Sequence, residues 1–522
     1  MRKFLKGALA LSVLLSYAAP AGAQVAGARR GVTAEDYYAF EFLGDPRLSP
    51  DGRWVAFVVT TIDQRQNRRL SQIWLAAADG SRPPRQFTTS TQSSSSPRWS
   101  PDGRALAFLS SRPAPGDAPQ ASASPSPSPS TSPSPSAPPQ PTETPAPAAT
   151  PGQVGTATTP GVPSALQTAA AAADATPRAQ VWVLPLDGGE ARRVTNLKNG
   201  VGNFDWSPDG TRLVLTSRTG PSDAKPPSSD VRHYKHTSYK FNDSGWFDDK
   251  RSHVWVVEVA SGAARQLTSG EDWNDSDPQW SPDGTRIAFV SDRTGRAFDE
   301  SRNTDVWVVP AAGGAPAKIS DHQEEDSSPR WSPDGKWLAF TGRMREREHP
   351  KIFLAPSAGG SPSRNVAPEL DLIPTDLTWA EAGRALYFET GVKGEAHLFR
   401  VEVRDGKIKQ VTKGARAVHF TDISGDSRRM VYAANDFQHP DDLYAADIDG
   451  SNERKLTSLN AKLWSRLQLA SVERMTYKGA DGWDVDGFLV KPLGWREGVK
   501  YPLILSIHGG PAGQYGVDWF HE

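Results

Sequence analysis

The 522-residue sequence contains no cysteine. Disulfide bonds, thiolate catalysis, cysteine-ligated metals and a lipid anchor on an N-terminal cysteine are therefore excluded. An excess of either charge is also lacking, because 59 Lys and Arg stand against 60 Asp and Glu. A balanced charge gives no reason to expect nucleic acid or an anionic membrane surface as a partner.

Long apolar runs are missing too, apart from one at the N-terminus. There Arg2, Lys3 and Lys6 precede an apolar stretch over residues 8–18, and small residues follow at 21–23. This order is typical of a secretory signal peptide, and it predicts cleavage after Ala23. The stretch is too short to span a bilayer. We expect a signal peptide over residues 1–23 and an exported protein, periplasmic or secreted, without a membrane span.

The sequence is rich in one short repeat, a turn that reads Trp-Ser-Pro-Asp-Gly. In such a turn Ser suits the first position, Pro presets φ at the second, Asp tolerates the third and Gly closes it. A short apolar run follows each copy. The copies stand at 48–52 (with Leu for Trp), 99–103, 206–210, 280–284 and 331–335, with degenerate ones at 379–383 and 423–427.

A second motif alternates with the first and also occurs seven times. It is an apolar run that ends in a glycine turn and leads into a short strand. Its copies lie at 73–80, 181–189, 254–262, 306–314, 352–360, 398–406 and 443–450.

Together the two motifs make units of about 45–50 residues with four antiparallel strands, the size of a propeller blade. The sequence therefore predicts an all-β, seven-bladed β-propeller of the WSPDG (PD40) repeat type over residues 46–460. An N-terminal segment, 24–45, precedes it with a short helix near 33–40. Because 46–49 and 455–457 read as complete first and last strands, we expect the ring to close through side chains alone.

Two insertions interrupt the repeats between the second and third strands of their units. Residues 113–177 are rich in Pro, Ser and Ala and cannot form a core, so we expect them to be disordered. Residues 219–251 are instead rich in aromatic residues. This second insertion is interpreted either as an extension of its blade or as a substrate gate. The gate residues would be Tyr234, Tyr239, Phe241, Trp246 and Phe247.

A different domain is expected over residues 461–522. Strands are predicted at 471–479, 484–492 and 501–510, with a hairpin-like turn at 480–482 between the first two. The last is a continuous apolar run, as in a strand buried on both faces. It leads into His-Gly-Gly-Pro at 508–511. A propeller followed by "DGWDVDGFLVKP" and "PLILSIHGGP" resembles the prolyl oligopeptidase family of serine peptidases (S9), in particular its dipeptidyl-peptidase and acylaminoacyl-peptidase members.

The resemblance implies an α/β-hydrolase domain with a Ser-Asp-His triad, covered by a propeller that admits only short peptides. It assigns an oxyanion donor to the backbone N–H of Gly510, with His508 and Gly509 shaping the loop. No Gly-x-Ser-x-Gly nucleophile elbow occurs in the 522 residues. We therefore expect the triad after Glu522, a truncated hydrolase domain, and an inactive chain. No cofactor is expected.

Two other groups of polar residues stand out in the sequence. Glu324 and Glu325 resemble the paired glutamates that bind substrate N-termini in dipeptidyl peptidases, but we interpret them as a solvated acidic loop. In the aromatic insertion, two histidines and three aspartates lack any recognised metal-ligand spacing, so no metal is assigned. These are His233, His236, Asp243, Asp248 and Asp249.

A non-enzymatic propeller that binds a protein partner, of the TolB-like kind, is the alternative function. It shares the turn repeat, which is weak evidence by itself. Residues 471–511 discriminate between the two, because a binding propeller has no need of an oxyanion strand and loop.

Overall fold

The computed structural model describes residues 29–114, 178–225, 229, 231–237, 239–241, 245–295, 303–509 and 513–519. The predicted signal peptide, the insertion from residue 115 to 177, and Gly510 lie outside the described residues. The chain divides into two compact units. One comprises Met1–Asp36 and Ala461–Glu497, and the other Tyr37–Asn460 and Gly498–Glu522. The domain boundaries predicted from sequence stay predictions.

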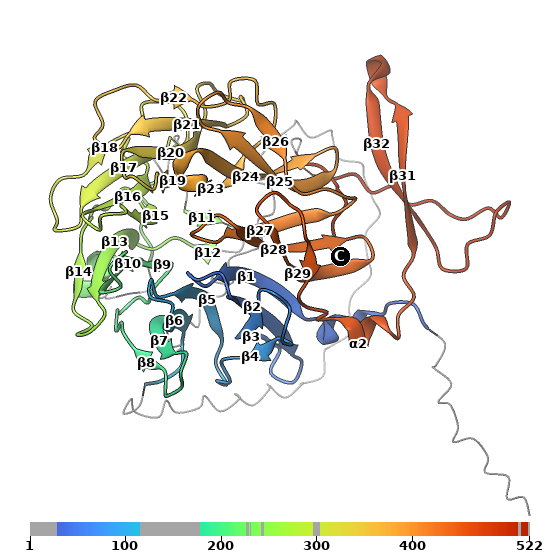
Figure 1. The fold of residues 1–522 in the computed structure, drawn as a ribbon, viewed down its shortest axis with the longest axis horizontal. Coiled ribbons are helices and arrows are strands. Elements are labelled where there is room, and N and C mark those ends of the chain that lie inside the picture. Colours follow the sequence, from blue (N-terminus) through green and yellow to red (C-terminus); the bar gives the residue numbers. More distant parts are fainter. Residues whose placement is uncertain are drawn as a thin grey trace, which may run out of the picture. The chain divides into compact units, whose positions relative to one another are not determined.

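In the second unit the described strands form antiparallel meanders of four strands each, apart from a two-stranded pair of β11 (Lys240–Phe241) and β12 (Gly245–Trp246) (Figure 1). Five meanders are separate sheets. A larger sheet combines two more, because a single parallel bridge from Ala396 to Ala417 joins β25 to β27. We number the meanders one to seven in chain order.

The strands of the first four meanders follow the predicted repeat. Meander one holds β1 (Phe42–Leu48), β2 (Trp54–Asp63), β3 (Arg68–Ala77) and β4 (Arg85–Gln86); two holds β5 (Ser94–Trp99), β6 (Ala105–Ser110), β7 (Gln180–Pro185) and β8 (Arg192–Arg193); three holds β9 (Phe204–Trp206), β10 (Arg212–Thr219), β13 (Arg251–Glu258) and β14 (Ala264–Gln266); four holds β15 (Asp275–Trp280), β16 (Arg286–Ser291), β17 (Asp305–Pro310) and β18 (Ala317–Lys318).

The last three meanders continue the same order. Meander five holds β19 (Asp326–Trp331), β20 (Trp337–Gly342), β21 (Lys351–Pro356) and β22 (Arg364–Asn365); six holds β23 (Thr375–Ala380), η2 (Glu381–Gly383), β24 (Ala385–Val392), β25 (Glu395–Glu402) and β26 (Ile408–Gln410); seven holds β27 (Ala417–Ile423), β28 (Arg429–Asp436), β29 (His439–Asp447) and β30 (Arg454–Lys455).

The repeated turn joins the first two strands of a meander through its serine and aspartate. In meander four the Ser281 hydroxyl donates to Asp283 at 2.6 Å and accepts the Arg286 N–H at 2.9 Å. The Gly284 N–H donates to the Ser281 carbonyl at 2.8 Å, with φ of 67° at the glycine. The serine thus forms hydrogen bonds both to the aspartate within the turn and to the strand that follows it. The positive φ explains why glycine ends the turn.

Hydrophobic clusters fill the spaces between neighbouring meanders, and the repeated tryptophan lies in them. Trp331 of meander five packs against Ala288 and Val308 of meander four. Its indole Nε1 donates to the Gln279 carbonyl at 3.1 Å, and the Arg286 guanidinium lies 4.7 Å above the ring. The clusters of the described residues thus join each meander to its two neighbours.

One such cluster joins the first meander to the last. Phe57 of β2 and Val431 of β28 are both fully buried in it. Among the described strands, β1 pairs only with β2, and β30 only with β29. The prediction of closure through side chains is confirmed for these residues. The first strand begins at Phe42 rather than at residue 46, because Phe42 to Gly44 continue the ladder with β2.

The other unit contains a hairpin of β31 (Ser471–Lys478) and β32 (Asp484–Lys491), joined by η3 (Ala480–Gly482). The two predicted strands and their turn are confirmed. The unit also contains α2 (Ala461–Trp464). The predicted N-terminal helix is a 3-10 helix, η1 (Ala34–Ala39), in which Asp36 accepts the Thr33 N–H at 2.9 Å.

Candidate functional site

The described part of the predicted oxyanion loop folds back on itself. His508 Nδ1 donates to the Gly509 carbonyl at 2.8 Å, and its ring meets Tyr515 edge to face at 5.9 Å. The Ser506 and Tyr515 hydroxyls are 3.2 Å apart. A Cβ at Gly513 would lie 2.6 Å from the Gly509 carbonyl, so glycine is required there. Gly510, the assigned donor, lies outside the described residues.

The segment before this loop differs from its prediction. Residues 501–510 were expected to form a buried strand, but the described residues of this segment, 501–509, pair with no strand in the described part of the chain. Leu503 is 80 % exposed and Ile504 91 % exposed. The apolar run has the composition of a buried strand, but a strand needs hydrogen-bonded neighbours, and none is present among the described residues.

Residues beyond the loop contact meanders six and seven. The Val517 N–H donates to the Gly394 carbonyl at 2.5 Å, and Val517 is buried. The Trp519 N–H donates to Asn435 Oδ1 at 3.2 Å. These contacts hold the segment after the predicted oxyanion loop against the sheets of its unit.

A polar cluster next to these contacts was missed by the sequence analysis. His419 Nε2 lies 2.9 Å from Asp441 Oδ1, which also accepts from Asn435 at 3.0 Å. Burial lowers the pKa of His419, but Asp441 and Glu389 outweigh it and raise the pKa to about 9. Burial, with Asp376 nearby, raises the pKa of Glu389. The cluster draws on β24, β27, β28 and β29, and no motif in the sequence links these strands.

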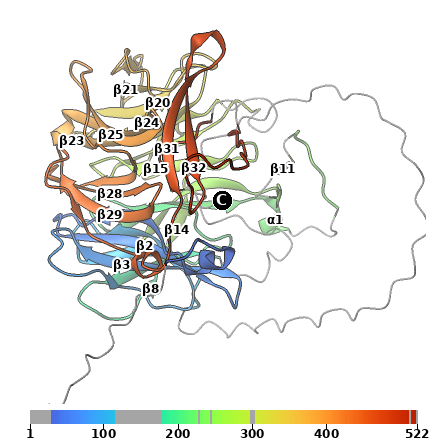
Figure 2. The same ribbon diagram turned by 90° about the vertical axis from the view of Figure 1, so that its right-hand side faces the viewer.

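The aromatic insertion is described in part, with α1 (Pro221–Ala224), β11 (Lys240–Phe241) and β12 (Gly245–Trp246). Figure 2 shows α1 and β11 to one side of the sheets. Tyr234, Tyr239 and Trp246 pack together, with ring centroids 5.5–5.9 Å apart. The Phe247 N–H donates to the Tyr239 carbonyl at 2.9 Å. Three of the five predicted gate residues thus form one cluster, and Phe241 is described only by its backbone. The gate role stays a prediction.

Of the acidic residues singled out in the sequence, Asp243 lies outside the described residues, and Glu325, Asp248 and Asp249 have partners in the structure. Glu325 lies 3.5 Å from Arg343 on the surface. In the aromatic insertion, Asp248 pairs with Arg218, and Asp249 accepts from the Ser222 hydroxyl at 2.6 Å. Within the described residues no group of three or more ligating side chains could hold a metal.

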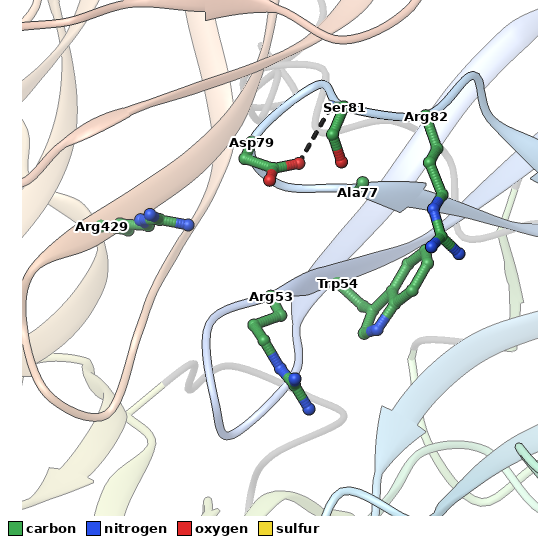
Figure 3. Close-up of a pocket in the computed structure, with 7 residues that line it drawn as sticks. All are labelled: Arg53, Trp54, Ala77, Asp79, Ser81, Arg82 and Arg429. Atoms are coloured by element: carbon green, nitrogen blue, oxygen red, sulfur yellow. Dashed lines mark hydrogen bonds between the residues drawn. The ribbon is translucent and has the colours of Figure 1, made fainter.

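A small cavity of about 190 Å³ lies where meanders one and seven meet (Figure 3). Its wall contains three arginines and a tryptophan, and the Asp79 carboxylate there accepts the Ser81 N–H at 2.9 Å. None of the predicted site residues lies in it. The lining residues are Arg53, Trp54, Ala77, Asp79, Ser81, Arg82 and Arg429.

Comparison with curated proteins finds peptidases. The chain is 25% identical over 528 residues to the uncharacterized peptidase YuxL of Bacillus subtilis, covering 94% of this chain and 68% of the relative. It is 28% identical over 286 residues to dipeptidyl-peptidase 5 of Porphyromonas gingivalis, covering 51% of this chain and 41% of that one. No protein-family model matches the chain.

Solved structures with the same fold include an acylaminoacyl peptidase from Pyrococcus horikoshii. It has a TM-score of 0.66 at 20% identity, over 93% of this chain and 63% of that one. The β-propeller domain of the trilobed protease from Pyrococcus furiosus has a TM-score of 0.51 at 15% identity, over 81% of this chain and 98% of that one. At these identities the likeness shows the fold, which is a β-propeller.

These relatives, a peptidase and a dipeptidyl-peptidase, support the resemblance of the chain to the prolyl oligopeptidase family of serine peptidases (S9), a family of enzymes. The chain spans 41–68% of the length of these two curated relatives. Among the described residues, no helix combines the length and apolar character that a membrane crossing requires.

Proposed function

We propose that the chain is part of an exported serine peptidase that removes short units, dipeptides or acylated amino acids, from the N-termini of peptides. The observation that carries the proposal is the likeness to a peptidase over 94% of the chain. A dipeptidyl-peptidase among the relatives and an acylaminoacyl peptidase among the structural neighbours support the substrate class. The basic and apolar residues 2–18 support export.

In this proposal the backbone N–H of Gly510 stabilises the oxyanion that forms when a serine attacks the scissile carbonyl. The fold of the preceding loop, with His508 bonded to Gly509, supports that role. The 522 residues contain no Gly-x-Ser-x-Gly, so the proposal assigns the triad to sequence outside them. These residues alone would then not turn over a peptide.

The seven meanders are proposed to act as the blades of one closed propeller that limits access to short peptides. The shared cluster of Phe57 and Val431 supports closure. The cluster of Tyr234, Tyr239 and Trp246 would meet substrates on their way to the site.

The test uses the protein expressed from its complete gene, assayed with dipeptidyl- and acylaminoacyl-nitroanilides. We expect hydrolysis of at least one class. Gly510→Pro removes the donor N–H and should lower kcat by about 100-fold or more with a smaller change in KM. A melting curve of the variant checks that it folds.

Absence of hydrolysis of both classes would reject the peptidase. Unchanged kcat in Gly510→Pro would reject the oxyanion role alone. Capture of a defined protein partner by an inactive protein would favour the alternative, a binding propeller of the TolB-like kind.

A further inference from the structure

Three side chains of meander five and the loop before it form a chain of hydrogen bonds. Ser363, in the turn before β22, has its Oγ 2.9 Å from His322 Nε2. His322, in the loop between β18 and β19, has its Nδ1 2.7 Å from Oδ1 of Asp326, the first residue of β19. Hydroxyl, imidazole and carboxylate thus follow one another in the order that serine nucleophiles require.

The imidazole and the carboxylate are both buried. Asp326 is 0% exposed, and the His322 ring packs on Phe353 with centroids 4.1 Å apart. A Cβ at Gly342 of β20 would lie 2.1 Å from Asp326 Oδ1 and 2.9 Å from His322 Nδ1. The absence of a side chain at residue 342 therefore makes room for the pair.

The geometry sets the direction of proton transfer. An ionised carboxylate only accepts, so the hydrogen shared with Asp326 lies on Nδ1 of His322. In the neutral imidazole Nε2 then carries a lone pair, and this atom faces the Ser363 hydroxyl. Ser363 is half-buried, so small reagents can reach it.

We propose that Ser363 is a nucleophile that accepts an acyl or phosphonyl group from a small activated ester, with His322 as its base and Asp326 as the positioning residue. Oγ forms a bond to the carbonyl carbon or phosphorus, and the serine proton passes to Nε2. The leaving group, a phenolate or fluoride, departs with its bonding electrons. The reaction is a single covalent event, without turnover.

A competing arrangement makes this reactivity depend on pH. Ser363 Oγ is also 3.0 Å from Asp321 Oδ1. When His322 is protonated, Nε2 donates to the serine and the serine donates to Asp321, so the serine has no base. Deprotonation of His322 restores the reactive arrangement.

The groups that face His322 are Asp326 on β19, Asp321 beside it, Asp305 on β17 with its partner Lys318 on β18, and the rings of Phe340 and Phe353. Burial lowers the pKa of His322, but Asp326, Asp321 and Asp305 outweigh it and leave the pKa above its usual value. Labelling should therefore rise with pH, with a midpoint above that of an ordinary histidine. The acidic surroundings favour neutral or cationic reagents.

The experiment treats the 522-residue chain with a fluorophosphonate at pH 5 to 9 and locates the adduct by peptide mass spectrometry. We expect the adduct on Ser363, and its loss in Ser363→Ala. His322→Gln should slow labelling by about 100-fold or more, since base catalysis contributes about that much. Asp326→Asn should slow labelling and shift its pH midpoint downward.

Ser261→Ala is the matched control. Ser261 occupies the corresponding turn of meander three, where its hydroxyl accepts the Ala263 N–H. This variant should label like the parent chain. An adduct absent from Ser363, or equally abundant on Ser261, overturns the proposal. A labelling rate that does not change with pH in the parent chain also overturns the proposal. This measurement needs no variant, so it remains valid even if a His322 variant unfolds.

Discussion

A comparison of two tryptophans of the repeated turn measures how much one hydrogen bond between meanders contributes to the free energy of unfolding. Trp331 and Trp280 are each 8% exposed and each lie under an arginine, at 4.7 and 4.9 Å. Trp331 Nε1 donates to the Gln279 carbonyl. Trp280 Nε1 is buried without a hydrogen-bond partner in the described structure.

Trp331→Phe should therefore lower stability by about 1–3 kcal/mol more than Trp280→Phe, because only the first removes the donor of the Gln279 carbonyl, while both replace the indole with the same smaller ring. Denaturant unfolding of the two variants measures the difference. Equal losses would mean that the indole contributes through packing alone.

The aspartates of the repeated turn are expected to make the stability of the fold depend on pH in the acid range. The Ser207 hydroxyl, with Thr211, lowers the pKa of Asp209 to about 2, and the Ser281 hydroxyl does the same for Asp283. A carboxylate whose folded pKa lies below its unfolded value stabilises the fold above the unfolded pKa, near 4. That contribution is lost as pH falls from about 4 to 2.

Asp209→Asn combined with Asp283→Asn should flatten the loss of stability between pH 4 and 2. Tryptophan fluorescence during acid titration measures this loss. Asp371→Asn, on the surface outside the repeated turns, is the control and should leave the acid transition unchanged. A double variant with the parent's acid transition would contradict the assignment.

At the scale of the strand, glycine in β20 is predicted to be required for packing rather than for backbone conformation. Gly342→Ala places a methyl group 2.1 Å from Asp326 Oδ1. We expect a loss of about 1–3 kcal/mol, because an overfilled site forces the buried pair apart. Gly44→Ala in β1 is the matched control, since a Cβ there meets nothing within 4 Å.

Thermal melting of the two glycine variants makes this comparison. Similar midpoints in Gly342→Ala and Gly44→Ala would show that the His322–Asp326 pair moves aside at no cost.

At the scale of the whole molecule, the Pro- and Ser-rich insertion is predicted to be dispensable. It enters from β6 and returns to β7, whose residues Ser110 and Gln180 are paired directly across the ladder. A short turn can connect such neighbours. Replacing residues 115–177 with a short Gly-Ser linker should leave the melting temperature within a few degrees of the parent. A large drop would show that the insertion packs on the sheets.

The repeats by themselves determined the four-stranded unit, its turns and the order of its strands. Ser-Pro-Asp-Gly encodes its turn locally, through a serine that bonds to an aspartate two residues away. The hairpin around residues 480–482 and the short helix after Thr33 were predictable for the same reason. His-Gly-Gly-Pro, with the preceding strands, carried the resemblance to the peptidase family.

Only the tertiary structure decided which polar side chains meet. Ser363 and His322 are 41 residues apart, and Glu389, His419 and Asp441 come from three different strands. Their proximity depends on how strands stack within and between meanders. The apolar run at 501–508 shows the limit of a local pattern. Its composition predicts a buried strand, but a strand forms only where other strands are present to pair with it. A local pattern encodes turns and strands, whereas contacts between distant residues follow from packing.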